Sequence, residues 1–276
     1  MDYDEPAEGG PDTIMRETGE VTLSTPNDTS LDPVERIAAE LHSLLAIVLY
    51  HADALILKTP SSLVSVAVQP LSFLFLIVIA TGGELFAPAL LGAIVIFFVG
   101  VGLADLPIEL SGMKRRSQFF ELFRSLPLSR PTMAVGMAVG LSLPGLLYGV
   151  LLLGVVIVLE GLGGVAIATI LTVCLVIWIW SVLTGYVLGV WLEKVIHVHR
   201  ATNATVVLTT TFAPVLYPVE LLPGSIQPFA LLVPTASASY LLRYAIGDVP
   251  FSSFALVALL AGTALSMVLA IYVKRY

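Results

Sequence analysis

Long apolar stretches alternate with short polar segments from residue 63 onward. A helix needs roughly 20 apolar residues to cross a hydrocarbon core of about 30 Å. Six stretches come close to that length, and we expect each to be a transmembrane helix: 63–80, 85–106, 132–159, 165–192, 205–219 and 254–273. The pattern therefore predicts an all-α polytopic membrane protein with a six-span transmembrane domain at residues 63–276.

A helix of a different kind precedes these stretches. Asp32 can cap a helix start, with Pro33 in the first turn and Glu35 three residues after the cap. Apolar residues then recur at helical spacing, opposed by a polar face, until His51 and Asp53 interrupt them. We expect residues 32–58 to form an amphipathic interfacial helix along the inner leaflet rather than a seventh span.

The segment after the fifth stretch is apolar but broken by prolines, at Pro214, Pro218, Pro223, Pro228 and Pro234. It is too interrupted to span the bilayer and too apolar to lie in water. A re-entrant hairpin between spans five and six reconciles both facts, provided that protein covers its backbone. The alternative is a plain extracellular loop with two surface helices.

Small residues four apart recur in the third and fourth stretches, as Gly136 with Gly140, Gly145 with Gly149, and Gly185 with Gly189. At about 100° per residue, the two pairs of the third stretch lie on opposite faces of one helix. We interpret all six glycines as helix-packing positions that allow close approach of neighbouring helices.

Composition excludes a soluble single-domain protein, because 57% of the residues are hydrophobic and only 12% are charged. The net charge of −7 comes from the first 32 residues, which hold nine acids and only Arg16. We expect residues 1–31 to be a disordered acidic tail. Because this start is polar where a signal peptide would be basic and then apolar, we expect it to stay in the cytoplasm.

Basic residues set the orientation. Residues 113–130 hold five of the thirteen Lys and Arg residues of the chain, and with alternating loops twelve fall inside and only Arg243 outside. Cytoplasmic loops are enriched in Lys and Arg, so we expect both termini in the cytoplasm of a plasma-membrane protein. Within this segment Phe119, Leu122, Phe123 and Leu126 have helical spacing, which predicts a short amphipathic helix. It is either a docking site or a topogenic loop that binds nothing.

Several chemistries lack the residues they need. The stretches contain no charged residue in their interiors, all four histidines lie outside them, and Cys174 is the only cysteine. We expect no catalytic residue, no metal site and no cofactor in this chain. A P-loop, GxxxxGK[ST], is absent, so the energy for any transport must come from elsewhere. A sodium-coupled carrier remains open, since carbonyls and hydroxyls around Thr209 to Thr211 are enough to bind Na⁺.

The chain resembles the type 2 ABC exporter permease family in the order of its elements. These are the first helix, the six spans, the phrase Leu-Pro-Leu-Ser-Arg at 126–130 and the proline-punctuated segment at 213–223, 232–235 and 240–243. The resemblance covers nearly the whole chain beyond the acidic tail. It implies a coupling helix that docks on a separate ATPase subunit through Gln118, Phe119, Glu121, Leu122, Phe123 and Arg124.

The same resemblance implies two ATPase copies that carry ATP and Mg²⁺, a second and identical permease chain, and no nucleic acid. The substrate would be an amphiphile: a drug-like molecule, a lipid or a lipid-linked glycan. We expect membrane lipid around the chain and the hairpin at the outer end of a charge-free path, which favours an extracellular gate formed by Pro218, Glu220, Pro223, Pro234 and Arg243. The alternatives are an ion-coupled secondary carrier and a membrane assembly or scaffold protein.

Overall fold

The computed structural model of the protein describes residues 33–53, 58, 61–113, 130–192 and 194–273. All regular elements in these ranges are helical. In chain order they are α1 (Pro33–Ala52), α2 (Ser61–Ala80), α3 (Phe86–Gly100), the π-helical turn η2 (Val101–Asp105), α4 (Leu106–Met113), α6 (Arg130–Glu160), α7 (Gly164–Trp191), α8 (Val195–Val206), the π-helical turn η3 (Val207–Phe212), the 3₁₀ turn η4 (Val219–Leu221), α9 (Gln227–Leu231), α10 (Pro234–Ala245) and α11 (Ser253–Val273).

Four helical segments in the described part are long and apolar enough to cross a membrane: Phe86–Gly112, Thr132–Glu160, Gly164–Trp191 and Ser253–Val273. Two further apolar helical pieces, Ile37–Ala52 and Pro70–Ala80, are shorter. The chain is therefore a helical membrane protein, as the apolar pattern predicts. The acidic tail and the basic segment after α4 lie outside the described residues, apart from Met113 and Arg130.

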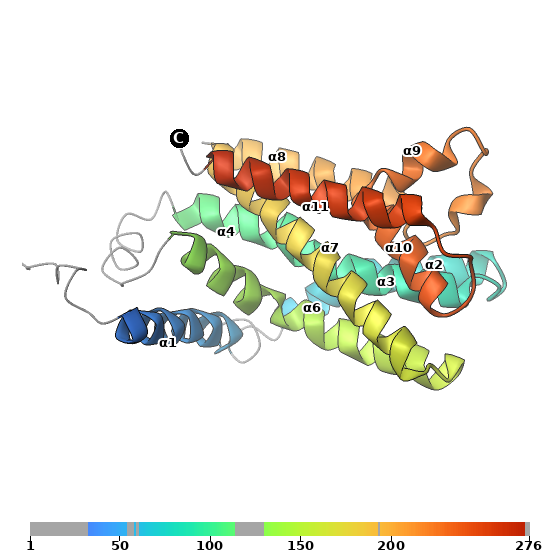
Figure 1. Ribbon diagram of the computed structural model, residues 1–276, viewed down its shortest axis with the longest axis horizontal. Coiled ribbons are helices and arrows are strands. Elements are labelled where there is room, and N and C mark those ends of the chain that lie inside the picture. Colours follow the sequence, from blue (N-terminus) through green and yellow to red (C-terminus); the bar gives the residue numbers. More distant parts are fainter. Residues whose placement is uncertain (1–32, 54–57, 59–60, 114–129, 193, 274–276) are drawn as a thin grey trace, which may run out of the picture.

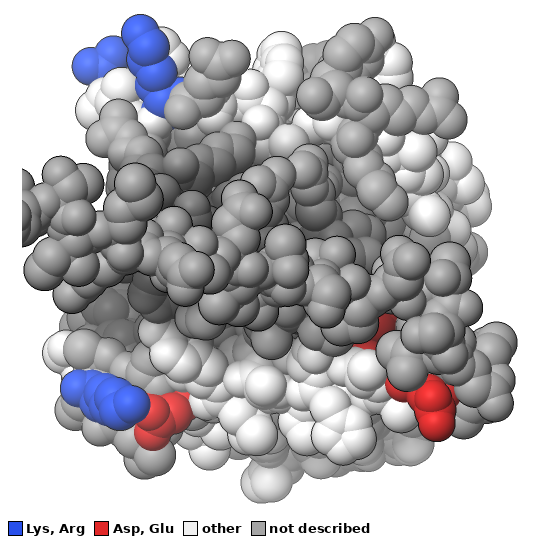
Figure 2. Space-filling view, turned by 90° about the vertical axis from the view of Figure 1, so that its left-hand side faces the viewer, with Lys and Arg blue, Asp and Glu red and all other residues white. Residues whose placement is uncertain are grey.

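The long helices lie side by side, with α4, α8 and the C-terminal end of α11 at one end and α9 and α10 at the other (Figure 1). From the α4 end, the Lys and Arg side chains that are visible lie at the upper left and lower left, and the visible Asp and Glu side chains at the lower left and lower right (Figure 2). The main core joins α3, α7, α10 and α11. A second core joins α1, α6, η2, α4 and α7. Helix α3 is thus packed on several sides, and most of the Phe86–Gly112 segment is buried.

The second apolar stretch forms a longer helix than predicted. Instead of ending at residue 106, the helix passes through η2 and continues to Met113. Asp105 and Glu109 therefore lie within a helical segment and not beyond its end. At 1.5 Å per residue Asp105 is about 29 Å from Phe86, which is close to the thickness of a hydrocarbon core of about 30 Å.

The fifth stretch differs most from the prediction. Its helix begins at Val195 rather than at residue 205, and it ends at Phe212 rather than at residue 219. Pro214 explains the early end, since a residue before proline is pushed out of the helical region. Ala213 has an extended backbone, with φ −68° and ψ 145°.

The predicted hairpin consists of two helices with different surroundings. No residue of α9 is buried, whereas eight of the twelve residues of α10 are: Thr235, Ala236, Ser237, Ala238, Ser239, Leu241, Leu242 and Arg243. The apolar ones belong to the main core with α3, α7 and α11. One arm of the segment is therefore covered by protein, and the other is exposed.

Candidate functional site at the α10 end

An ion cluster around Arg243 ties three segments together at the α10 end. The Arg243 side chain is only 8% exposed, and its Nη1 donates to Glu220 Oε2 over 2.7 Å. Its Nε donates to Asp248 Oδ2 over 2.7 Å as well. Because Glu220 lies on η4 and Asp248 in the turn before α11, one arginine of α10 holds both segments.

The cluster keeps Arg243 charged. Burial by itself would lower the pKa of the guanidinium, but the hydrogen bonds and charges of Glu220 and Asp248 outweigh burial and raise the pKa above its ordinary value. Removing the partners of a buried charge typically costs about 3–5 kcal/mol. The cluster therefore stabilises this end as long as at least one carboxylate remains.

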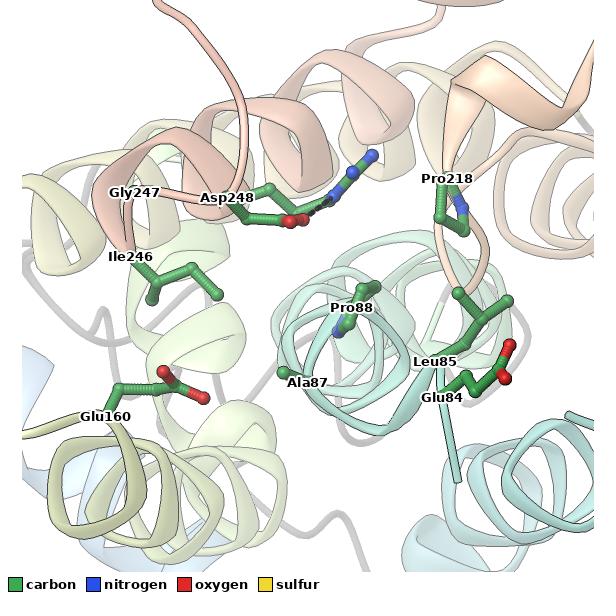
Figure 3. A pocket seen from close by; sticks show the side chains of 10 residues that line it. Glu84, Leu85, Ala87, Pro88, Glu160, Pro218, Ile246, Gly247 and Asp248 are labelled. Carbon is green, nitrogen blue, oxygen red and sulfur yellow. Dashed lines mark hydrogen bonds and ion pairs between the residues drawn. The ribbon is translucent and has the colours of Figure 1, made fainter. Parts of the chain in front are cut away.

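An open pocket of about 360 Å³ lies beside the cluster. Its lining comes from the start of α3 and the residues before it, from the end of α6 and from the α10–α11 turn: Glu84, Leu85, Ala87, Pro88, Glu160, Pro218, Arg243, Ile246, Gly247 and Asp248. Figure 3 shows Glu84 and Glu160 on opposite sides of the first turn of α3, with the Glu160 carboxylate directed toward Ile246. The lining is acidic, since Arg243 is already paired.

A hydroxyl group of α10 donates a hydrogen bond to a backbone carbonyl that a proline leaves without an N–H donor. In a π-helical turn the carbonyl of Thr209 would accept from the N–H of residue 214, which is a proline and has none. Thr235 Oγ1 donates to this carbonyl instead. Thr235 is fully buried, so the bond lies away from solvent.

Two further hydroxyl groups of α10 donate to backbone carbonyls of the irregular segment, each three residues before a proline. Val215 precedes Pro218, and the Val215 carbonyl accepts from Ser239 Oγ over 2.7 Å. Leu231 precedes Pro234, and its carbonyl accepts from Ser237 Oγ. Buried backbone carbonyls need a partner, and more so at membrane depth. The side chains of α10 are therefore what allows this irregular backbone to be buried.

The predicted gate residues separate into two groups. Pro218, Glu220 and Arg243 meet at the pocket and the ion cluster. Pro223 lies before α9, where its carbonyl accepts from the N–H of Ile226 over 2.8 Å. Pro234 starts α10 and packs against Gly262.

The predicted packing glycines lie at close helix contacts. In α6, Gly136 and Gly140 face Ile47 and His51 of α1, while Gly145 and Gly149 face Phe97 and Phe98 of α3. In α7, Gly185 lies against the Gly102 carbonyl of η2, and Gly189 against Pro107 of α4. A methyl group at any of the six positions would meet backbone or side-chain atoms of the neighbouring helix.

The predicted coupling residues Gln118, Phe119, Glu121, Leu122, Phe123 and Arg124 lie outside the described residues. Sequence reasoning missed two features of the site. It did not find Asp248 as the second partner of Arg243, nor the hydroxyl groups of Thr235, Ser237 and Ser239. The signal for the hydroxyl groups is their alternation with alanine directly after Pro234.

Within the described ranges, no group of three or more His, Cys, Asp or Glu side chains is arranged to hold a metal ion. No protein-family model matches the chain, and no curated protein matches it either.

Proposed function

We propose that this chain is the membrane-spanning permease subunit of an ATP-driven ABC exporter. It moves an amphiphilic substrate, such as a drug-like molecule, a lipid or a lipid-linked glycan, out of the cytoplasm across the plasma membrane. A separate ATPase subunit supplies the energy, and a second, identical permease chain completes the path. The proposal includes six spans, cytoplasmic termini and a hairpin that re-enters the outer leaflet.

One observation carries most of this proposal: the α10 arm of the proline-broken segment before the last helix is buried by protein. Three backbone carbonyls of the segment, one of them left without a donor by Pro214, accept from three hydroxyl groups of α10. A surface loop has no need of such partners, because water supplies them. An irregular segment satisfied in this way suits the outer end of a membrane path, where the family resemblance also expects it.

Contacts between the helices connect the segment where the ATPase would dock with the helices around α10. The segment 114–129, where the ATPase would dock, joins the end of α4 to the start of α6. Helix α4 contacts α7 and α8, and α6 contacts α1 and α3. A displacement of the docking segment would thus reach α3 and α7, two of the three long helices that pack against α10.

The docking role is tested with the variant Phe119→Ala/Phe123→Ala. Truncating two central aromatic anchors commonly costs about 2 kcal/mol or more, roughly thirtyfold in affinity. We expect tagged wild-type protein to purify with a Mg²⁺-dependent ATPase activity and the variant to lose it while remaining in the membrane. The matched control replaces Phe75 and Phe254, two exposed phenylalanines of α2 and α11, and should keep the activity. Equal activity in all three samples would remove the docking assignment.

Orientation is tested separately by cysteine labelling in a Cys174→Ala background. Cysteines at the exposed positions Ser225 and Gly163 should react with a membrane-impermeant reagent added outside intact cells. A cysteine at Lys194, which is also exposed, should react only after the cells are opened. Labelling of Lys194→Cys from outside would reverse the orientation.

A second candidate is an ion-coupled carrier, favoured by Asp105 and Glu109. They lie one turn apart inside the Phe86–Gly112 helix, and acidic groups in membrane helices often mark ion pathways. Transport that stops with an ionophore but continues with vanadate would favour this candidate.

A further inference from the structure

Residues 207–250, from η3 to the turn before α11, are called the cap below. In the described part of the chain, every side-chain hydrogen bond donated from α9 and α10 ends on another cap residue. These bonds run from Gln227 to Leu222, from Thr235 to Thr209, from Ser237 to Leu231, from Ser239 to Val215, from Tyr240 to Pro250 and from Arg243 to Glu220 and Asp248. The cap is thus cross-linked internally along most of its length. Thr209 and Thr210 of η3 donate outside the cap, to backbone carbonyls of Thr205 and Val206 in α8, the helix that continues into η3.

The contacts of the cap with α3, α7 and α11 are of a different kind. Apolar side chains of α10 and of residues 213–216 pack against these helices. Two close approaches occur where the helices carry no side chain: Gly92 of α3 lies against the backbone of Val215, and Gly262 of α11 lies against Pro234. Hydrogen bonds are directional, whereas apolar contacts are not. A small shift along this interface breaks no hydrogen bond.

Both ends of the cap have backbone that can absorb such a shift. At one end η3 is π-helical, which is a less regular geometry than the α-helix before it. At the other end residues 250–252, where the cap joins α11, have no regular secondary structure. Hinges are typically a few positions of this kind at the ends of elements.

We propose that the cap moves as one body against α3, α7 and α11, and that the pocket beside Arg243 is the seam that this movement widens and closes. The lining of the pocket divides accordingly. Pro218, Arg243 and the 246–248 turn belong to the cap, while residues 84–88 and Glu160 belong to the helices around it (Figure 3).

This movement differs from a gate that opens by parting Glu220 from Arg243. Both residues lie within the cap, so their ion pair stays closed throughout the movement. The inference goes beyond the proposed function and does not depend on it, because it requires neither an ATPase nor a substrate. Its test therefore uses the purified full chain in lipid nanodiscs.

The first measurement compares spin-label distances in a Cys174→Ala background. One pair, Ser225→Cys with Tyr244→Cys, lies within the cap, and a second pair, Glu84→Cys with Gly163→Cys, lies outside it. The third pair, Ser225→Cys with Gly163→Cys, crosses the seam. We expect narrow distance distributions within each body and a clearly wider or two-peaked distribution across the seam. A seam-crossing distribution as narrow as the other two would overturn the proposal.

The second measurement is hydrogen exchange of Ser239→Ala, with Ser266→Ala as the matched control. Both serines are buried and bond to another segment, Ser239 to Val215 and Ser266 to Thr184. If the cap is one cooperative unit, Ser239→Ala should speed amide exchange about tenfold in all of its helices, equivalent to about 1.4 kcal/mol. Ser266→Ala should leave the cap unchanged. Faster exchange confined to the neighbourhood of Val215, with α9 and η4 unaffected, would contradict a single body.

Discussion

Replacing Thr235 by valine tests whether its hydroxyl group substitutes for the missing N–H of Pro214. Valine has the same shape as threonine, so the substitution opens no cavity and removes only the bond from Thr235 Oγ1 to the Thr209 carbonyl. A buried group left without its partner costs about 1–3 kcal/mol. We expect Thr235→Val to lower the free energy of unfolding by that amount.

Thr202→Val is the matched control, because the same chemical change should have the opposite outcome. Thr202 is fully buried, and its hydroxyl has no hydrogen-bond partner among the described residues. The wild-type protein therefore already bears the cost of an unpaired group there. Replacing it by a methyl group should leave stability unchanged or raise it by about 1 kcal/mol.

Both variants can be measured by reversible unfolding in mixed micelles, followed by far-ultraviolet circular dichroism. Thr235→Ser adds a further comparison, since it keeps the hydroxyl and loses one methyl group, worth about 0.8 kcal/mol. The order of stability should be Thr202→Val at or above wild type, then Thr235→Ser, then Thr235→Val. Equal losses for the two valine variants would refute the role given to Thr235.

Two further predictions concern packing and charge at the same end. Gly92→Ala should destabilise the protein by about 1–3 kcal/mol, because the methyl group would overlap the backbone of Val215. The control is Gly154→Ala in α6, whose methyl group meets nothing within 4 Å and which should be neutral or stabilising in the same unfolding assay. In the ion cluster, each single variant, Glu220→Gln or Asp248→Asn, leaves Arg243 with one carboxylate partner. The double variant should therefore lose more stability than the sum of the two single losses. Additive losses in this double-mutant cycle would contradict a shared buried charge.

The sequence pattern predicts the helical class and the long apolar helices well, because a membrane span needs a nearly unbroken apolar run. It fails where a helix begins in polar residues. Lys194 directly precedes α8, and His197 and Arg200 lie on exposed positions of its first turns, which suggests a loop. Only Val198 and Thr202, four residues apart and both buried, indicate the helix face that packs on α4 and η2.

The prolines predict where the backbone is irregular, but they do not predict which side chains donate hydrogen bonds to its carbonyls. Pro214 identifies one carbonyl that lacks an N–H donor, and Pro218 marks the irregular backbone around a second carbonyl that accepts from α10. The donors lie 24 to 26 residues further along the chain, and only the packing of α10 brings them there. The alternation of Thr and Ser with Ala is a usable signal, yet the pairing itself depends on the tertiary fold.

For the charged residues of the site, too, the sequence predicts only part of the pairing. Pairing of Glu220 with Arg243 was predictable, because both are charged and flank an apolar hairpin. Asp248 follows Arg243 by five residues and reaches its Nε only because Gly247 turns the chain back with φ +81°. A turn of this kind depends on the glycine, whereas its direction in space depends on where α11 packs.

The central claim, export driven by a separate ATPase, is tested most directly in inside-out membrane vesicles that contain the chain with its co-purifying partner. The measurement is accumulation of a fluorescent phospholipid and of a cationic dye in the vesicle lumen. We predict accumulation that requires ATP, stops with vanadate, continues with an ionophore and is lost in Phe119→Ala/Phe123→Ala. Accumulation that follows an ion gradient, or that is equal in vesicles with and without the chain, would contradict the account.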